Sequence, residues 1–133
     1  MKCLVTDAVY PCIARELKKY IEVDTTDGKP LSRAELLERI AGYDILVMRV
    51  DPKIDSEILD AAKNLKMIGV CAVGTNHIDM KYAEEKGIHV FNAPGMNANA
   101  VAELTIAKML EVSRKTIQAN YDVKVNQDRK SVV

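Results

Sequence analysis

The stretch LKMIGVCAVGTNHID, residues 65–79, joins an apolar run to a polar turn. Its first part, residues 65–73, favours a strand with apolar side chains on both faces, which is typical of a parallel sheet covered by helices on both sides. Gly74 interrupts the run, and Asp79 precedes a helical pattern at residues 80–86. The stretch therefore predicts a strand–turn–helix unit of an α/β fold.

The same alternation of strand and helix patterns extends along the chain as far as residue 92. Ser32 is followed three residues later by Glu35, which is the capping-box spacing that starts a helix. Five strands alternating with four helices predict a flavodoxin-like five-stranded parallel sheet with helices on both faces. The strands are expected at residues 2–6, 21–24, 44–50, 65–73 and 88–92, and the helices at residues 12–20, 32–41, 56–64 and 80–86.

The segment after Pro94 has a different pattern. No Gly or Pro interrupts a helical pattern from residue 98 to 125, so we expect one long helix of about 40 Å there. This divides the chain into a domain of residues 1–97 and a segment of residues 98–133 that starts with the helix.

One side of the expected long helix is unusually apolar. At 100° per residue its apolar side chains fill an arc of about 180°, wider than the ~100° stripe that a surface helix usually buries. Such a face predicts contact with another molecule, most simply the same helix of a second copy, and hence a homodimer. The apolar residues are Val101, Ala102, Ile106, Met109, Leu110 and Val112.

Composition excludes several classes of partner. The 133 residues carry 19 Lys and Arg against 19 Asp and Glu, so no overall field attracts nucleic acid or anionic lipid. No apolar run approaches the ~20 residues of a membrane span, and no leader pattern follows Met1, so we expect a soluble protein. Cys3, Cys12 and Cys71 lack C-x-x-C spacing, which favours free thiols and a cytoplasmic location.

In an open parallel sheet, ligands bind beyond the carboxyl ends of the strands, so the residues that follow each strand are the candidates. Arg49 is the most informative of them, because a guanidinium at the end of an apolar strand suits a carboxylate or a phosphate. A surface ion pair with a neighbouring Asp is the alternative for Arg49. The full set of candidates is Asp7, Thr25, Arg49, 74–76 and 92–97.

Two of these segments have a specific possible role. At the turn of Val73, Gly74, Thr75 and Asn76, successive backbone N–H groups can point toward an anion, because glycine adds no Cβ. A plain connection from strand to helix is the alternative. Asn97 can bind a polar ligand group or cap the long helix, and these two roles are compatible.

Other kinds of site lack the residues that they need. His77 and His89 have no carboxylate spaced to orient them and no Cys or His at metal-ligand spacing, so neither is expected to catalyse or to bind metal. The third strand ends in Arg49 where a phosphoacceptor pocket with Asp7 would need an acidic residue. The segment AVYPC after the first strand is not a phosphate-binding loop, which argues against bound FMN.

Several motifs in order resemble the NAD-dependent D-2-hydroxyacid dehydrogenases. The similarity runs over residues 44–115 and includes ILVMRV and LKMIGVCAVGTNHIDMKYAEEKGIHVFNAPGMNANAVAELTIAKML. The resemblance implies that Arg49 helps to hold the acidic group of a small 2-hydroxy or 2-oxo acid. It also implies that the backbone at Val73, Gly74 and Thr75 binds the substrate carboxylate, with Asn97 nearby. Members are commonly dimers joined through the region of the long helix.

The resemblance also implies what this chain lacks. The family's G-x-G-x-x-G fingerprint and its catalytic Arg, acidic residue and His lie downstream of the long helix, and residues 126–133 contain no such motif. No catalytic residue is therefore assigned, and NAD or NADP is expected only in the complete enzyme. The expected function is the substrate-binding part of such a dehydrogenase. A stand-alone module that binds small acids, or a dimerising fragment, is the alternative.

Overall fold

The computed structural model describes residues 1–6, 11–26 and 28–127, so Asp7 lies outside the described residues. The chain forms two compact units, Met1–Pro94 and Gly95–Val133.

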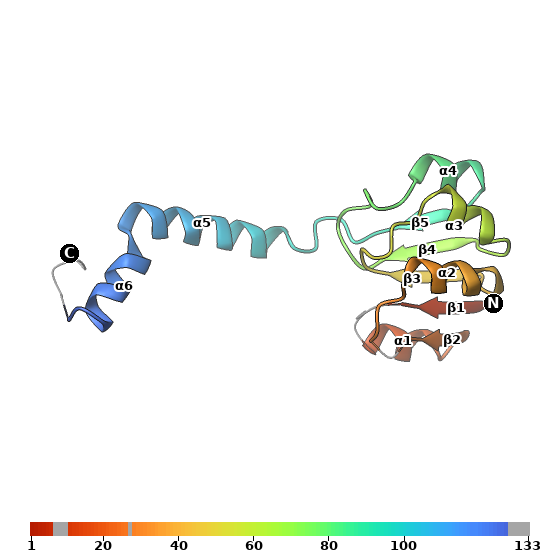
Figure 1. Cartoon of the computed structure of the whole chain (residues 1–133), viewed down its shortest axis with the longest axis horizontal. Helices are drawn as coiled ribbons and strands as arrows, with labels where there is room; N and C mark the ends of the chain where they lie inside the picture. The colour runs from red at the N-terminus through yellow and green to blue at the C-terminus, as the bar shows by residue number, and fades with distance from the viewer. Residues whose placement is uncertain (7–10, 27, 128–133) are drawn as a thin grey trace. The chain divides into compact units, whose positions relative to one another are not determined.

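The first unit is built on a five-stranded sheet whose strands are all parallel (Figure 1). The order across the sheet is β2-β1-β3-β4-β5, which confirms the predicted fold. β3 is shorter than the predicted range of 44–50, so that Arg49 directly follows its last residue. The strands are β1 Lys2–Val5, β2 Glu22–Thr25, β3 Ile45–Met48, β4 Met67–Val70 and β5 His89–Phe91.

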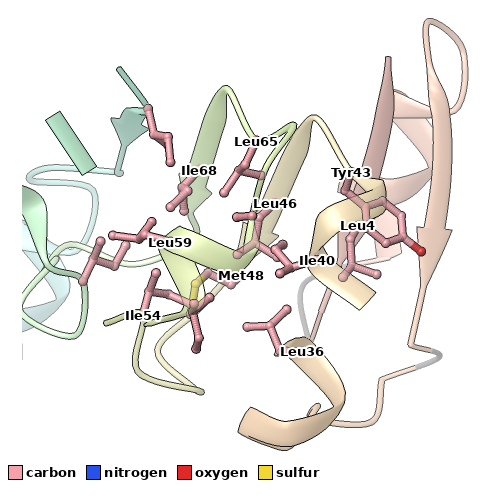
Figure 2. Close-up of a cluster of buried hydrophobic side chains, with 14 of the residues drawn as sticks. Leu4, Leu36, Ile40, Tyr43, Leu46, Met48, Ile54, Leu59, Leu65 and Ile68 are labelled. Atoms are coloured by element: carbon pink, nitrogen blue, oxygen red, sulfur yellow. The ribbon is translucent and has the colours of Figure 1, made fainter. Parts of the chain in front are cut away.

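Helices pack on both faces of this sheet, as predicted. Successive side chains of a strand point to opposite faces, so Leu4 belongs to one buried cluster while Cys3 and Val5 belong to another. The larger cluster, shown in Figure 2, includes residues of α2, α3 and α4, whereas α1 packs on the smaller one. The helices are α1 Pro11–Leu17, α2 Arg33–Arg39, α3 Ser56–Ala61 and α4 Met80–Glu85, and a 3-10 turn, η1, spans Ile40–Gly42.

Side-chain caps set where three of these helices begin. The predicted capping box is present in α2, where the Ser32 side chain accepts from the Glu35 N–H and the Glu35 carboxylate accepts from the Ser32 N–H. Asp55 and Asp79 each accept a hydrogen bond from the backbone N–H of the third helical residue, Ile58 in α3 and Tyr82 in α4. These caps fix the ends of the loops that follow β3 and β4.

The second unit corrects one expectation, because the helix over residues 98–125 is interrupted. It consists of α5, Ala98–Arg114, and α6, Thr116–Lys124, separated by Lys115 in the left-handed conformation at φ 51° and ψ 40°. The Ser113 hydroxyl donates to the Leu110 carbonyl at 3.1 Å, and such side-chain bonds compete with the helical backbone. The Lys115 N–H then closes the turn onto the Glu111 carbonyl.

Two further features concern the chain as a whole. None of the helices in the described residues is long and apolar enough to cross a membrane. Cys3 is buried, Cys71 half-buried and Cys12 exposed, and all three are free thiols.

Candidate functional site

The carboxyl ends of β3 and β4 place Arg49 beside Cys71. Met48 and Val70 are paired across the two strands, and the Cys71 N–H donates to the Met48 carbonyl at 2.7 Å. Burial raises the pKa of the Cys71 thiol, and the positive charge of Arg49 only partly opposes this effect. Arg49 itself is exposed and makes no ion pair with any residue that the structure describes. Its guanidinium is therefore available to an anion.

The turn that follows β4 offers unpaired backbone donors next to this arginine. Within the described part of the chain, the N–H groups of Val73, Gly74 and Thr75 donate to no acceptor. Gly74 has no positive φ. A Cβ there would lie 3.3 Å from the Asn76 Oδ1, so the Asn76 side chain would have to shift slightly. Successive free N–H groups around a glycine can bind a carboxylate.

Three hydrogen bonds hold this turn in place. The Asn92 side-chain amide donates to the Val73 carbonyl at 2.6 Å. The Ala93 N–H donates to the Ala72 carbonyl at 3.0 Å, and the Ile78 N–H donates to the Thr75 carbonyl at 2.9 Å. Asn92 was only one of several residues after β5 in the sequence-based set, and its position directly after the strand was the sole signal of this role.

A short bridge ties the loop that carries Arg49 to the loop that carries Gly74. Ile54 and Ile78 pair in parallel and are both buried. The Ile54 N–H donates to the His77 carbonyl at 2.8 Å, and the Asp79 N–H donates to the Ile54 carbonyl at 2.9 Å. Loops 49–54 and 74–79 thus form one structural unit, although nothing in the sequence pattern singles out these isolated isoleucines.

His77 is buried within this pair of loops, with 8% of its surface exposed. Neither ring nitrogen has a hydrogen-bond partner among the described residues. Burial lowers the pKa of the imidazole, while the Asp51 carboxylate and the backbone of Arg49 act in the opposite direction. The Arg49 backbone thus lies close to the ring without completing a hydrogen bond. No cluster of His, Cys, Asp or Glu in the described residues could hold a metal ion.

The remaining predicted residues do not belong to this pair of loops. Thr25 ends β2, which β1 separates from β3. Asn97 belongs to the second unit, where it occupies the N-cap position of α5, but its side chain makes no capping hydrogen bond. Arg49 and the turn at Val73, Gly74 and Thr75 are therefore the predicted residues that the first unit brings together.

The glycines of this chain do not fit a dinucleotide cofactor. A dinucleotide pyrophosphate needs a glycine-rich turn between a strand and a helix. No two of the six glycines stand in G-x-G spacing, so no contact with NAD or NADP is assigned to these residues.

Sequence relatives and solved structures point to the same protein family. Residues 3–132 match the family model described as D-isomer specific 2-hydroxyacid dehydrogenase, catalytic domain. The D-3-phosphoglycerate dehydrogenase of Archaeoglobus fulgidus is 42% identical over 125 residues, which make up 93% of this chain. A solved protein of Thermus thermophilus superposes with a TM-score of 0.80 at 38% identity, over 91% of this chain.

A further solved relative is the NAD+-bound 3-phosphoglycerate dehydrogenase of Entamoeba histolytica, with a TM-score of 0.69 and 33% identity over 84% of this chain. In each case the match covers a minor part of the other protein. The chain spans 23% of the Archaeoglobus relative, 40% of the Thermus protein and 38% of the Entamoeba enzyme. Most of the length of each relative therefore has no counterpart in these residues.

Proposed function

The chain belongs to the family of D-isomer-specific 2-hydroxyacid dehydrogenases, and we propose that it forms the substrate-binding part of an NAD(P)-dependent enzyme of this family. One observation carries the proposal. The Arg49 side chain and the N–H groups of residues 73–75, which have no partner among the residues that the structure describes, follow adjacent strands. The Ile54–Ile78 bridge ties their loops together. We call these groups, the Arg49 guanidinium and the three N–H donors, the carboxylate site.

The donors of the carboxylate site suit a small acid. A carboxylate can accept from the turn N–H groups through one oxygen and from the Arg49 guanidinium through the other. The substrate would be a small 2-hydroxy or 2-oxo acid, and the relative from Archaeoglobus suggests 3-phosphoglycerate. In the complete enzyme, hydride would pass between this acid and a nicotinamide held outside these residues, as the NAD+-bound relative suggests. No residue of this chain is assigned to proton transfer.

The proposal extends to the organisation of the enzyme. Residues 1–97 would form the substrate domain, and residues 98–133 would lead into a nucleotide-binding domain. We further propose a cytoplasmic homodimer that is joined through α5. Six large apolar side chains of α5 are more than half exposed, and water contact with them is costly. They are Val101, Leu104, Ile106, Met109, Leu110 and Val112.

Titration of the labelled chain with small acids, followed by amide NMR shifts, tests the carboxylate site. D-Glycerate and 3-phosphoglycerate at millimolar concentration should move the amides of residues 73–76. Neutral glycerol, which lacks the carboxylate, should not. The movement should be lost in Arg49→Ala and kept in Arg39→Ala, which removes an exposed arginine at the end of α2.

The same samples separate the candidate functions. NADH should move no amide, because the chain has no glycine-rich cradle, and dehydrogenase activity should be absent. Unchanged shifts at residues 73–76 in saturating acid would reject the carboxylate site. Micromolar affinity for NADH would reject the assignment of the cofactor to another part of the enzyme.

A further inference from the structure

His77 has no partner that explains a polar ring in a buried position. Only 8% of its surface is exposed, and neither ring nitrogen finds a hydrogen-bond partner among the described residues. An unpaired buried polar group lowers stability, whereas an apolar ring of similar size would not. Packing alone therefore does not account for a histidine here.

The surroundings of the ring connect it to the carboxylate site. The backbone of Arg49 is close enough to the imidazole to favour its protonated form, although no hydrogen bond joins the two among the described residues. The backbone carbonyl of His77 accepts the Ile54 N–H at 2.8 Å. His77 is thus hydrogen-bonded to one end of loop 49–54 and lies near the other end, while its own loop carries Gly74 and Thr75.

We propose that His77 is a positioning residue of the carboxylate site: its buried ring supports the backbone of Arg49 and sets the distance between this arginine and the N–H groups of residues 73–75. The inference rests on the proposed function, because the site that His77 positions is the proposed carboxylate site. When an acid binds the Arg49 guanidinium, the ring N–H can complete a hydrogen bond to the Arg49 carbonyl. The ring nitrogen of His77 that has no partner in the ligand-free chain would then be the hydrogen-bond donor in the acid-bound state.

The charged groups that act on the ring are few. Burial lowers the pKa of the ring, and among the described residues the Asp51 carboxylate and the backbone of Arg49 act in the opposite direction. A bound carboxylate adds a second negative charge nearby, so binding should raise the pKa of His77. The chain has only two histidines, and the other, His89, is exposed on β5 and serves as the internal reference.

The first part of the test needs no ligand. Imidazole proton signals of the labelled chain are followed by NMR from pH 8 to pH 5, together with the Val50 amide, whose peptide group contains the Arg49 carbonyl. If the ring supports this peptide, the Val50 amide should shift with the same midpoint as His77. If the chemical shift of the Val50 amide does not change as His77 titrates, the inference is overturned, whether or not the acids bind.

The second part adds D-glycerate and compares three chains. In the wild type, the pKa of His77 should rise while the signals of His89 stay unchanged. His77→Phe keeps the ring but loses the donor, and should weaken acid binding roughly fivefold, the effect of losing about one hydrogen bond. His77→Asn restores an N–H donor, so it should bind within about twofold of the wild type yet lose the pH dependence.

The outcomes separate the two proposals. Equal affinity of the wild type and His77→Phe, with intact amide spectra, would overturn the positioning role and leave the carboxylate site standing. If Val50 follows His77 but D-glycerate moves no amide at all, the proposed function fails, and the positioning of a carboxylate site fails with it. Weakened binding in His77→Asn as well as in His77→Phe would assign the effect to packing and overturn the inference.

Discussion

The side-chain amide of Asn92 donates a hydrogen bond of 2.6 Å to the backbone carbonyl of Val73. Asn92 directly follows β5 and Val73 lies in the turn after β4, so this bond joins the ends of two neighbouring strands. Asn92 thus occupies the Val73 carbonyl, while the N–H groups of Val73, Gly74 and Thr75 find no acceptor among the described residues. A small acid therefore meets donors at this point.

Replacing Asn92 should loosen the turn. Asn92→Ala is expected to cost about 1 kcal/mol of unfolding free energy, the usual contribution of one hydrogen bond, and to speed amide exchange at residues 73–76. Asn64→Ala is the matched control, because the Asn64 amide makes a similar 2.8 Å bond to the Ala41 carbonyl away from the turn. Denaturant titration and hydrogen exchange measure the two effects. Equal exchange at residues 73–76 in both variants would contradict the prediction.

A side chain at position 74 should obstruct the carboxylate site more than it harms the fold. The Cβ of Gly74→Ala would lie 3.3 Å from the Asn76 Oδ1, so the Asn76 side chain must shift by a few tenths of an ångström and the turn N–H groups become less accessible. Affinity for D-glycerate should fall about tenfold, equivalent to about 1.4 kcal/mol.

Gly42→Ala provides the control for this substitution. No atom lies within 4 Å of a Cβ added at Gly42, and its φ is not positive. This variant should bind acids like the wild type. Retained affinity in Gly74→Ala, measured by the same NMR titration, would mean that the ligand does not approach this turn.

The buried His77 should make stability depend on pH in the mildly acidic range. Because burial lowers its pKa below 6.5 in the folded chain, the unfolded chain binds a proton first as the pH falls. The unfolding free energy should therefore be constant above pH 6.5 and decline toward pH 5. His77→Phe should remove this decline.

Asp44 and Asp55, the carboxylates that pair with Lys66 and Arg33, should not contribute to this decline. Hydrogen bonds and ion pairs, chiefly with Lys66 and Arg33, lower the pKa values of Asp44 and Asp55 below 3.8. Their contribution is present above that value and is lost only in stronger acid. Denaturant titrations at pH 7, 6 and 5 give the measurement, and an unchanged slope in His77→Phe would show that another group is responsible.

Alanine substitutions of two neighbouring residues of β4 should lower the unfolding free energy by very different amounts. Ile68 is fully buried in the larger core cluster, and Ile68→Ala should cost about 2–5 kcal/mol through lost contacts and a cavity. Met67 is 38% exposed, so Met67→Ala should cost less than about 1 kcal/mol. The midpoint of urea unfolding reports both values. A similar loss for the two variants would contradict the described burial of β4.

A charge on the apolar side of α5 should weaken the proposed homodimer. Met109 is 66% exposed, and Met109→Asp should raise the dimer dissociation constant about tenfold or more, because a carboxylate would be buried at the contact. Arg114→Gln, on the polar side of α5, should leave it unchanged. Sedimentation at several concentrations checks this, with the sheet monitored by amide spectra. A wild-type chain that stays monomeric at tens of micromolar would reject the dimer.

The sheet could be predicted because its signals are local. Ser32 and Glu35 mark a helix start by their spacing, and the apolar runs around Leu46 and Ile68 mark buried strands. The break at Lys115 could not be predicted in the same way. No Gly or Pro marks it, and the left-handed backbone of Lys115 has no signal in the local sequence.

Only the part of the candidate site that has a local sequence signal could be predicted. Arg49 and Gly74 are visible as a charge and a glycine at the ends of strands. The bridge between Ile54 and Ile78 and the burial of His77 depend on how two loops meet in space. Single apolar residues in polar loops are common, so the sequence carries no pattern that pairs these two.

The Ile54–Ile78 bridge has a thermodynamic consequence for any ligand of these loops. Two separate loops would lose conformational entropy when a ligand ordered them, and that loss would weaken binding. Here the buried isoleucines and their two backbone hydrogen bonds have already restricted both loops during folding. A small acid would therefore bind a preorganised surface, and calorimetry should show little change in heat capacity beyond that of the acid's own desolvation.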